Sequence, residues 1–422
     1  MLQGRDAPDL THMNQTDIIW HNQEFRLYLG STGFSGVAFA MQQLLLAWIL
    51  IGILELPATQ VGVIQAAVGI PGIFLMLLGG ARADGVDPRI LLLQVYSLAP
   101  LLPLFLIAII SFEQLGVLSV LLWGLGMSVV VSYSSPAQQV ILNRVASSAV
   151  QKAVSAATAI GFMVQMLGLG VAGTMDALGL MPVLSFQALC IVLGAFAVRR
   201  LNPQVPIRTS SDSTLNNILA GLKAVYLHKV ILQVLTINFV SSIFNAGTFM
   251  TVFPFIIKRV YDGDALLLSM MMIIFYGGAT ASNFIMIRLM PLTHPGKIFL
   301  ITQFSRMLIL GIIWINPSFW LFALATIGWG LNMGVTTTLA RTIVQESASE
   351  EYRARILSVY SLGLLGSPPI GALILGWIIE SFGTLNALVP AMCISIVLFV
   401  YGVFWSDVYK YESPIRQHKQ KN

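Results

Sequence analysis

The chain is poor in charge: Asp, Glu, Lys and Arg make up 10% of its 422 residues, against 56% hydrophobic residues and a mean hydropathy of +0.82. This composition excludes a water-soluble domain, because the apolar surface far exceeds what one core could bury. It predicts an all-α protein that crosses a lipid bilayer many times. The net charge of +5 fits loops that face anionic headgroups, and we expect no nucleic-acid partner.

Groups that carry catalytic or metal chemistry are also scarce. The sequence has two cysteines and five histidines, and the histidines are scattered outside the apolar runs. Cys190 and Cys393 lie inside apolar runs, where a cysteine acts as a small hydrophobic residue. The sequence holds no His, Cys and carboxylate cluster, no phosphate-binding glycine loop and no nucleophile–base pair. We therefore expect no enzyme, no metal site and no cofactor.

Twelve apolar runs reach about 20 residues, the length that a helix needs to cross the hydrocarbon core. Six lie in the first half, at 27–54, 58–80, 90–110, 114–134, 151–174 and 180–198. Six lie in the second half, at 230–256, 266–290, 298–316, 318–340, 355–379 and 386–406. We expect an N-terminal six-helix bundle at 1–198, a polar linker at 199–229, and a C-terminal six-helix bundle with its tail at 230–422.

The basic residues predict which way the chain is oriented. If the spans alternate from a cytoplasmic start, 20 of the 23 Lys and Arg lie in cytoplasmic segments, two (Lys258 and Arg259) lie in outer loops, and Arg306 lies within a span. Such an excess marks the cytoplasmic side. Residues 1–24 have no apolar run, so we expect no cleaved signal peptide. Both termini and the linker are predicted to be cytoplasmic, in a multi-pass protein of the cell inner membrane.

The two halves resemble each other when the second is slid back onto the first by one constant offset, the offset that brings Cys393 onto Cys190. Because this offset holds without an insertion, it predicts a tandem duplication in parallel orientation and two pseudo-symmetric bundles. It also aligns Ser35 with Asn238, Gln42 with Asn245, Ser155 with Ser358, Gly168 with Gly371, and Gly173 with Gly376.

Between the second and third apolar runs lies the charged turn GGARADGVDPR, residues 79–89. It resembles the signature loop of the major facilitator superfamily, although Arg82, Gly85 and Pro88 depart from that pattern. The resemblance implies that Gly80 lets neighbouring helices approach. It also implies that Asp84 and Arg89 take part in a cytoplasmic gate, with Asp84 at a helix end where it can pair with an arginine or a helix N-terminus.

The segment from Arg341 to Pro369, with Gln345-Glu346-Ser347 and Arg353-Ala354-Arg355, is similar to the branch that includes the enterobactin exporter and macrolide efflux proteins. The resemblance covers nearly the whole chain. It implies a monomeric transporter that exports an amphipathic organic molecule, drug-like or siderophore-like, by alternating access. A facilitator or importer of a small metabolite, and a non-transporting receptor or assembly partner, stay open as alternatives.

Polar side chains within the spans are the candidate substrate-binding residues, because such groups face a partner or a wet cavity. In the first and seventh spans they share one helical face. We expect Gln42 and Asn245 to face each other across a central cavity; hydrogen bonding between neighbouring helices is the alternative. The candidates are Ser35, Gln42, Gln65, Gln165, Asn238, Ser242, Asn245, Tyr276, Asn332 and Tyr360, with Thr336 and Trp329 as further members.

Glycines at 161, 168, 170 and 173 in the fifth span resemble a glycine-rich antiporter motif of the superfamily, with Leu169 where a proline is expected. We expect these glycines to serve close helix packing. Arg306, with Gln303 one turn earlier, could attract an anionic substrate. The favoured interpretation is that its long side chain reaches back to the headgroups.

No carboxylate lies in the middle of an apolar run. All 18 acidic residues fall at or beyond the ends of the runs, whereas a proton carrier is best placed in the membrane centre, where desolvation tunes it. We therefore expect uniport, or proton coupling through a carboxylate at the outer rim, for which Glu55 and Asp176 are the candidates.

Overall fold

A computed structural model describes residues 22–145, 150–203, 214–290, 292–349 and 352–413, which are helical with no strand in these ranges. Within these ranges twelve helical segments are long and apolar enough to span a membrane, as predicted. The N-terminal half contains α2 (Gln23–Trp48) with the π-helical turn η2 (Ile49–Ile53), α3 (Ala58–Gly85), α4 (Pro88–Leu98), α5 (Leu101–Ser111), α6 (Val117–Val145), α7 (Val150–Gly173), α8 (Met175–Leu178) and α9 (Leu180–Arg199).

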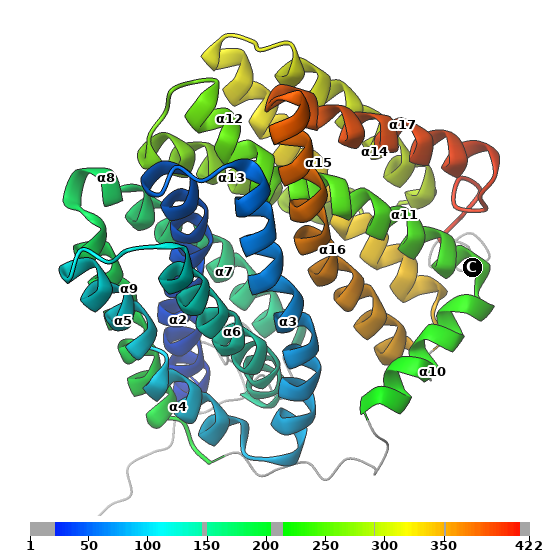
Figure 1. Ribbon diagram of the computed structural model, residues 1–422. Coiled ribbons are helices and arrows are strands. Elements are labelled where there is room, and N and C mark those ends of the chain that lie inside the picture. Colours follow the sequence, from blue (N-terminus) through cyan, green and yellow to red (C-terminus); the bar gives the residue numbers. More distant parts are fainter. Residues whose placement is uncertain (1–21, 146–149, 204–213, 291, 350–351, 414–422) are drawn as a thin grey trace, which may run out of the picture.

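A connecting helix, α10 (Thr214–Leu227), precedes the C-terminal half. This half contains α11 (Lys229–Gly247) with the π-helical turn η4 (Thr248–Val252), α12 (Phe253–Arg259), α13 (Ala265–Leu289), α14 (Pro295–Trp314), α15 (Phe319–Ser347), α16 (Arg353–Phe382), the 3₁₀ turn η5 (Leu385–Leu388) and α17 (Val389–Phe404). Figure 1 shows the N-terminal half, α2 to α9, beside the C-terminal half, α11 to α17.

The two halves repeat the same helix contacts. In the first half α3 contacts α6, and α2 contacts α7 and α9; in the second half α13 contacts α15, and α11 contacts α16 and α17. Glycines allow two of these approaches: Gly168 lies against the α2 backbone at Val37 and Met41, and Gly371 lies against the α11 backbone at Ile243. Of the four fifth-span glycines predicted to serve close packing, Gly168 does so here and Gly173 does so against Ser269, whereas Gly161 has no described atom within 4 Å of the place of a side chain.

The constant offset between the halves is wrong in detail. Every described residue with a positive φ belongs to one of three pairs at corresponding turns: Glu55 with Asp262, Glu113 with Asn316, and Gly179 with Gly383. The separation in sequence differs from pair to pair and is largest for the first. The helices α2 and α11, which begin at Gln23 and Lys229, are also further apart than the offset predicts. Short insertions therefore shift the register early in the chain, because turns tolerate changes of length that helix interfaces do not.

The two halves meet mainly through α3 with α16 and α7 with α13. Gly62 lies against the backbone of Ala372 and Gly376, and Gly69 against Pro369. In the other pair Gly173 contacts Ser269, whose hydroxyl donates to the Leu169 carbonyl at 2.8 Å. We call the end of the molecule at which these contacts concentrate the closed end. The opposite end, where α3 and α16 diverge in Figure 1, carries α10 and is called the linker end.

At the closed end each half holds a helix start of the other half with a carboxylate. Asp176, after α7, accepts a hydrogen bond from the Ala265 N–H at the start of α13, at 2.8 Å, and another from the Trp48 indole at 3.1 Å. Glu380, near the end of α16, accepts from the Ala58 N–H at the start of α3, at 3.0 Å. Helix starts carry free N–H donors and a positive dipole end, so these carboxylates hold the halves together there.

Candidate functional site

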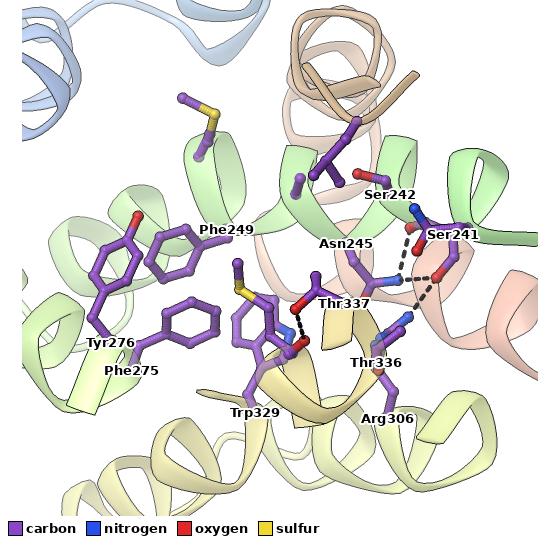
Figure 2. Close-up of a pocket in the computed structure, with 15 residues that line it drawn as sticks. Ser241, Ser242, Asn245, Phe249, Phe275, Tyr276, Arg306, Trp329, Thr336 and Thr337 are labelled. Atoms are coloured by element: carbon purple, nitrogen blue, oxygen red, sulfur yellow. Dashed lines mark hydrogen bonds between the residues drawn. The ribbon is translucent and has the colours of Figure 1, made fainter. Parts of the chain in front are cut away.

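A pocket of about 170 Å³ lies within the C-terminal half, between α11, η4, α13, α14, α15 and α16. Figure 2 shows that its two walls differ: polar side chains of α11, α14 and α15 lie on one side, and aromatic side chains of η4, α13 and α15 on the other. The pocket can therefore contact a polar group and an apolar group of one ligand at the same time.

Arg306 of α14 forms the centre of the polar wall. Its Nε donates to Asn332 Oδ1 at 3.0 Å and its Nη2 to Thr336 Oγ1 at 3.0 Å, both on α15. Its Nη1 donates to Gln303 Oε1 at 3.0 Å and also to Ser241 Oγ of α11. All four acceptors are uncharged. Among the described residues no carboxylate forms an ion pair with this guanidinium.

The interpretation that Arg306 reaches the headgroups is therefore wrong. The residue lies eleven positions after Pro295, the first of α14, which places it about 16 Å along the helix at 1.5 Å per residue. It is only 4% exposed, because hydrogen bonds to three helices hold the guanidinium inside the bundle. The local sequence of a helix does not show whether an arginine in the middle of a span points to lipid or to protein.

The aromatic wall is built on Phe249, which lies in the π-helical turn η4. Its ring stacks on Phe275 with centroids 4.0 Å apart and meets Trp329 edge-on at 5.8 Å. Tyr276 also meets Phe249 edge-on at 5.8 Å. Stacked and edge-to-face rings form a flat, polarisable surface that suits a ring or an alkyl chain of a ligand.

Polar residues of the N-terminal half reach the C-terminal half beside this pocket. The Gln43 amide nitrogen donates to the Tyr276 hydroxyl at 3.2 Å, and its oxygen accepts from Gln165 at 2.9 Å. Gln65 of α3 accepts from Thr251 at 2.6 Å and donates to the Met250 carbonyl at 3.2 Å. Three of the predicted residues, Gln65, Gln165 and Tyr276, thus lie where the two halves meet.

The expectation that Gln42 faces Asn245 is wrong. Asn245 lines the pocket, where its amide donates to the Ser241 carbonyl at 2.9 Å. Gln42 instead accepts from Gln187 of α9 at 3.2 Å, inside the N-terminal half. Successive helix residues point about 100° apart, so the neighbouring Gln43 is the one that turns toward the C-terminal half.

The other predicted binding residues divide between pocket and packing. Asn238 and Ser242 line the pocket, although Ser242 also accepts from Ser367 at 2.7 Å. The Tyr360 hydroxyl donates to the Thr337 carbonyl at 3.4 Å. Ser35 is buried in the N-terminal half, where it accepts from Gln138 at 3.1 Å.

Two residues of the pocket, Phe249 and Phe275, were not among the predicted binding residues, and neither was Gln43, which lies beside the pocket. Nothing in the sequence distinguishes Phe249 and Phe275 from the many phenylalanines that face lipid, because both environments are apolar.

The three predicted gate residues, Gly80, Asp84 and Arg89, differ from one another in what surrounds them. Gly80 has open space where a side chain would lie, and it is Gly79 that contacts the α6 backbone at Ser132. Arg89 donates from Nη2 to the Arg199 carbonyl at 2.6 Å, so in this conformation it caps the end of α9 within its own half. The side chain of Asp84 lies outside the described part of the structure. Within the part that is described, no group of His, Cys, Asp or Glu could hold a metal ion.

Solved structures of membrane transporters share this fold. The nucleoside transporter NupG superposes with a TM-score of 0.73 at 14% sequence identity, over 92% of this chain and 100% of that one. A bacterial homologue of the human lysosomal transporter Spinster, in an inward-facing and unoccupied conformation, gives 0.67 at 12%, over 92% and 98%. A POT family transporter in complex with 5-aminolevulinic acid gives 0.71 at 12%, over 93% and 97%. No curated protein matches the sequence.

The twelve spans of the described residues and these neighbours show that the chain has the fold of the major facilitator transporters. Within that class the chain belongs to the transmembrane secretion effector family, whose model matches residues 20–418.

Proposed function

We propose that the chain exports an amphipathic organic small molecule across the cell inner membrane by alternating access, as a monomer with its linker and both termini in the cytoplasm. The observation that carries this proposal is a pocket with one polar and one aromatic wall beside the interface between two pseudo-symmetric halves. Such halves move the pocket from one side to the other by rocking about their interface. Export is supported by the family's description as transmembrane secretion effectors, and a place near the enterobactin and macrolide exporters by the resemblance of residues 341–369 alone.

In this conformation the pocket would communicate with the cytoplasm. The halves are joined at the closed end, whereas the predicted cytoplasmic segments lie at the linker end, where basic residues gather. Export then requires that the contacts of Asp176 and Glu380 break while a new contact forms at the linker end. We assign that new contact to Asp84, at the end of α3, together with Gly80 and Arg89.

The test is flux in oriented membrane vesicles to which a panel of amphipathic compounds, including macrolides and catechol-type siderophores, is added from outside. We expect accumulation in inside-out vesicles and none in vesicles without the protein. Asp84→Asn is the matched control: it should lower turnover and leave affinity unchanged, because it changes the gate and not the pocket. Saturable uptake only in right-side-out vesicles would replace export by import of a metabolite. Binding without flux in either orientation would favour a receptor.

Proton coupling, where it occurs, would use a carboxylate at the closed end. Asp176 is the stronger candidate because it joins the two halves, whereas Glu55 is exposed at a turn. Protonation of Asp176 would remove its charge from the start of α13 and weaken the closed end. We expect Asp176→Asn to abolish accumulation driven by a pH gradient and Glu55→Gln to retain it. Accumulation that survives both substitutions would rule out this route.

A further inference from the structure

The guanidinium of Arg306 is buried, and no carboxylate of the described residues forms an ion pair with it. Its four described hydrogen bonds go to hydroxyl and amide oxygens of Ser241, Gln303, Asn332 and Thr336. The three ion pairs among the described residues involve Lys229, Arg259 and His294 instead, all near helix ends. Neutral dipoles offset part of the desolvation of a buried charge, and an opposite charge offsets much more.

The same side chain lines the pocket. A guanidinium has five N–H donors, and the four contacts leave one N–H of Nη2 free among the described residues. Asn245 also lines the pocket, and its buried Oδ1 has no hydrogen-bond partner among the residues that the structure describes. The pocket therefore presents a positive charge with an unused donor, beside an unused acceptor.

The position of the aromatic wall limits the size and nature of the ligand. Phe249, Phe275 and Trp329 face the polar wall across the pocket (Figure 2). A small inorganic anion would leave this wall without a contact, and a purely apolar compound would leave the cation uncompensated. A ligand with an anionic oxygen group bonded to a ring or short alkyl body satisfies both walls.

We propose that this pocket is an anion-binding subsite and that the transported compounds are organic anions. The carboxylate, sulfonate or phosphate group binds Arg306, and the apolar body lies against Phe249 and Trp329. The arginine is preorganised by Ser241, Gln303, Asn332 and Thr336, so binding does not require the side chain to be ordered first. The substrate class deepens the proposed transport function and rests on it, whereas the subsite itself is tested by binding alone.

The test is binding to the purified full-length protein in a neutral detergent. The probes are 2-naphthoate and its neutral amide, which share one ring system and differ in charge. We expect the naphthoate to bind at least about tenfold tighter, equivalent to about 1.4 kcal/mol. Dodecyl phosphate, in place of the naphthoate, distinguishes a lipid-like body from a ring, and inorganic phosphate alone should bind weakly or not at all.

Two variants test whether Arg306 causes the preference for the anion. Arg306→Gln should remove the preference for the naphthoate, whereas Arg288→Gln, which removes an exposed arginine near the end of α13, should retain it. Because Arg306→Gln could fold poorly, Ser241→Asp is the second variant. It places a carboxylate against the guanidinium as an internal counterion, so the protein should stay folded and lose the preference.

Equal binding of naphthoate and amide to the wild type, or a preference that survives in Ser241→Asp, would overturn the subsite. Failure of the subsite and failure of the transport proposal are distinguishable. Vesicle flux of neutral amphipathic compounds without anion preference would refute only the subsite, and anion binding without any flux would refute only transport.

Discussion

Both halves of the molecule join their first, third and fourth spans with polar side chains, but the two clusters differ in charge. In the N-terminal half Gln138 of α6 donates to Tyr96 of α4 at 2.7 Å and to Ser35 of α2 at 3.1 Å. In the C-terminal half Arg306 of α14 joins Ser241 of α11 to Asn332 and Thr336 of α15. The positions correspond closely, since Ser35 and Ser241 lie equally far from the starts of α2 and α11.

The difference in charge between the two clusters shows where the two pseudo-symmetric halves differ. The neutral cluster satisfies its own hydrogen bonds and serves to connect helices, which is the ordinary use of intramembrane polar groups. The charged cluster borders a pocket and lacks a counterion within the described chain. The helices are therefore arranged in the same way in both halves. Because only the C-terminal cluster contains a charge, only that cluster is a candidate binding site.

The substitution with the largest expected effect places a cation in the neutral cluster and tests whether that cluster tolerates one. Tyr96 is fully buried, so we expect Tyr96→Arg to lower the free energy of unfolding by about 3 kcal/mol or more, because an unpaired charge is costly to bury. Yield and thermal melting of the purified protein measure this, with Tyr96→Phe as the control. A folded, stable Tyr96→Arg protein would show that the helix bundle tolerates a buried, unpaired arginine. The burial of Arg306 would then need no functional explanation.

Removing one arginine partner should affect stability and binding together. Asn332→Leu deletes the acceptor of Arg306 Nε and the donor to the Thr302 carbonyl. We expect a loss of about 1.5–3 kcal/mol in the free energy of unfolding, the range for hydrogen bonds to charged groups. Binding of 2-naphthoate should also weaken, as calorimetry can measure. Unchanged binding would show that ligand recognition does not depend on the positioning of Arg306 by Asn332.

The matched change in the neutral cluster should affect stability alone. Gln138→Leu removes the donor that joins Tyr96 and Ser35. We expect a loss of about 1 kcal/mol in the free energy of unfolding, typical of a neutral hydrogen bond. The affinity for 2-naphthoate should not change. Weaker binding in this variant would place the ligand between the halves, in contact with both clusters.

At the closed end both halves place a carboxylate at a helix start of the other half, so the matched substitutions should have effects of similar size. Asp176→Asn and Glu380→Gln each remove a charge from a helix start, and we expect each to destabilise the closed end by about 0.5–1 kcal/mol. Electron paramagnetic resonance distances between spin labels on Gln60 and Ser381, in a background without the native cysteines, report the open population. A large effect from only one substitution would show that the two contacts are not equivalent.

The sequence determined the twelve spans, because an apolar run of membrane length has few alternatives to a spanning helix. The excess of Lys and Arg in alternate loops predicted the orientation, and matching glycines such as Gly168 and Gly371 predicted two pseudo-symmetric halves. These features are local or periodic. They survive the register shift between the halves, which moved the predicted partner of Ser35 from Asn238 to Ser241.

Only the tertiary structure decided which face of each helix meets protein and which meets lipid. Both surroundings are apolar, so hydropathy does not orient a helix about its own axis. For that reason Gln43 and not Gln42 reaches Tyr276, Gly79 and not Gly80 contacts α6, and Arg306 points into the bundle. Three of its four partners, Ser241, Asn332 and Thr336, lie on two other helices, and helix packing decides where these side chains meet the guanidinium. The fourth, Gln303, lies one turn earlier on the same helix.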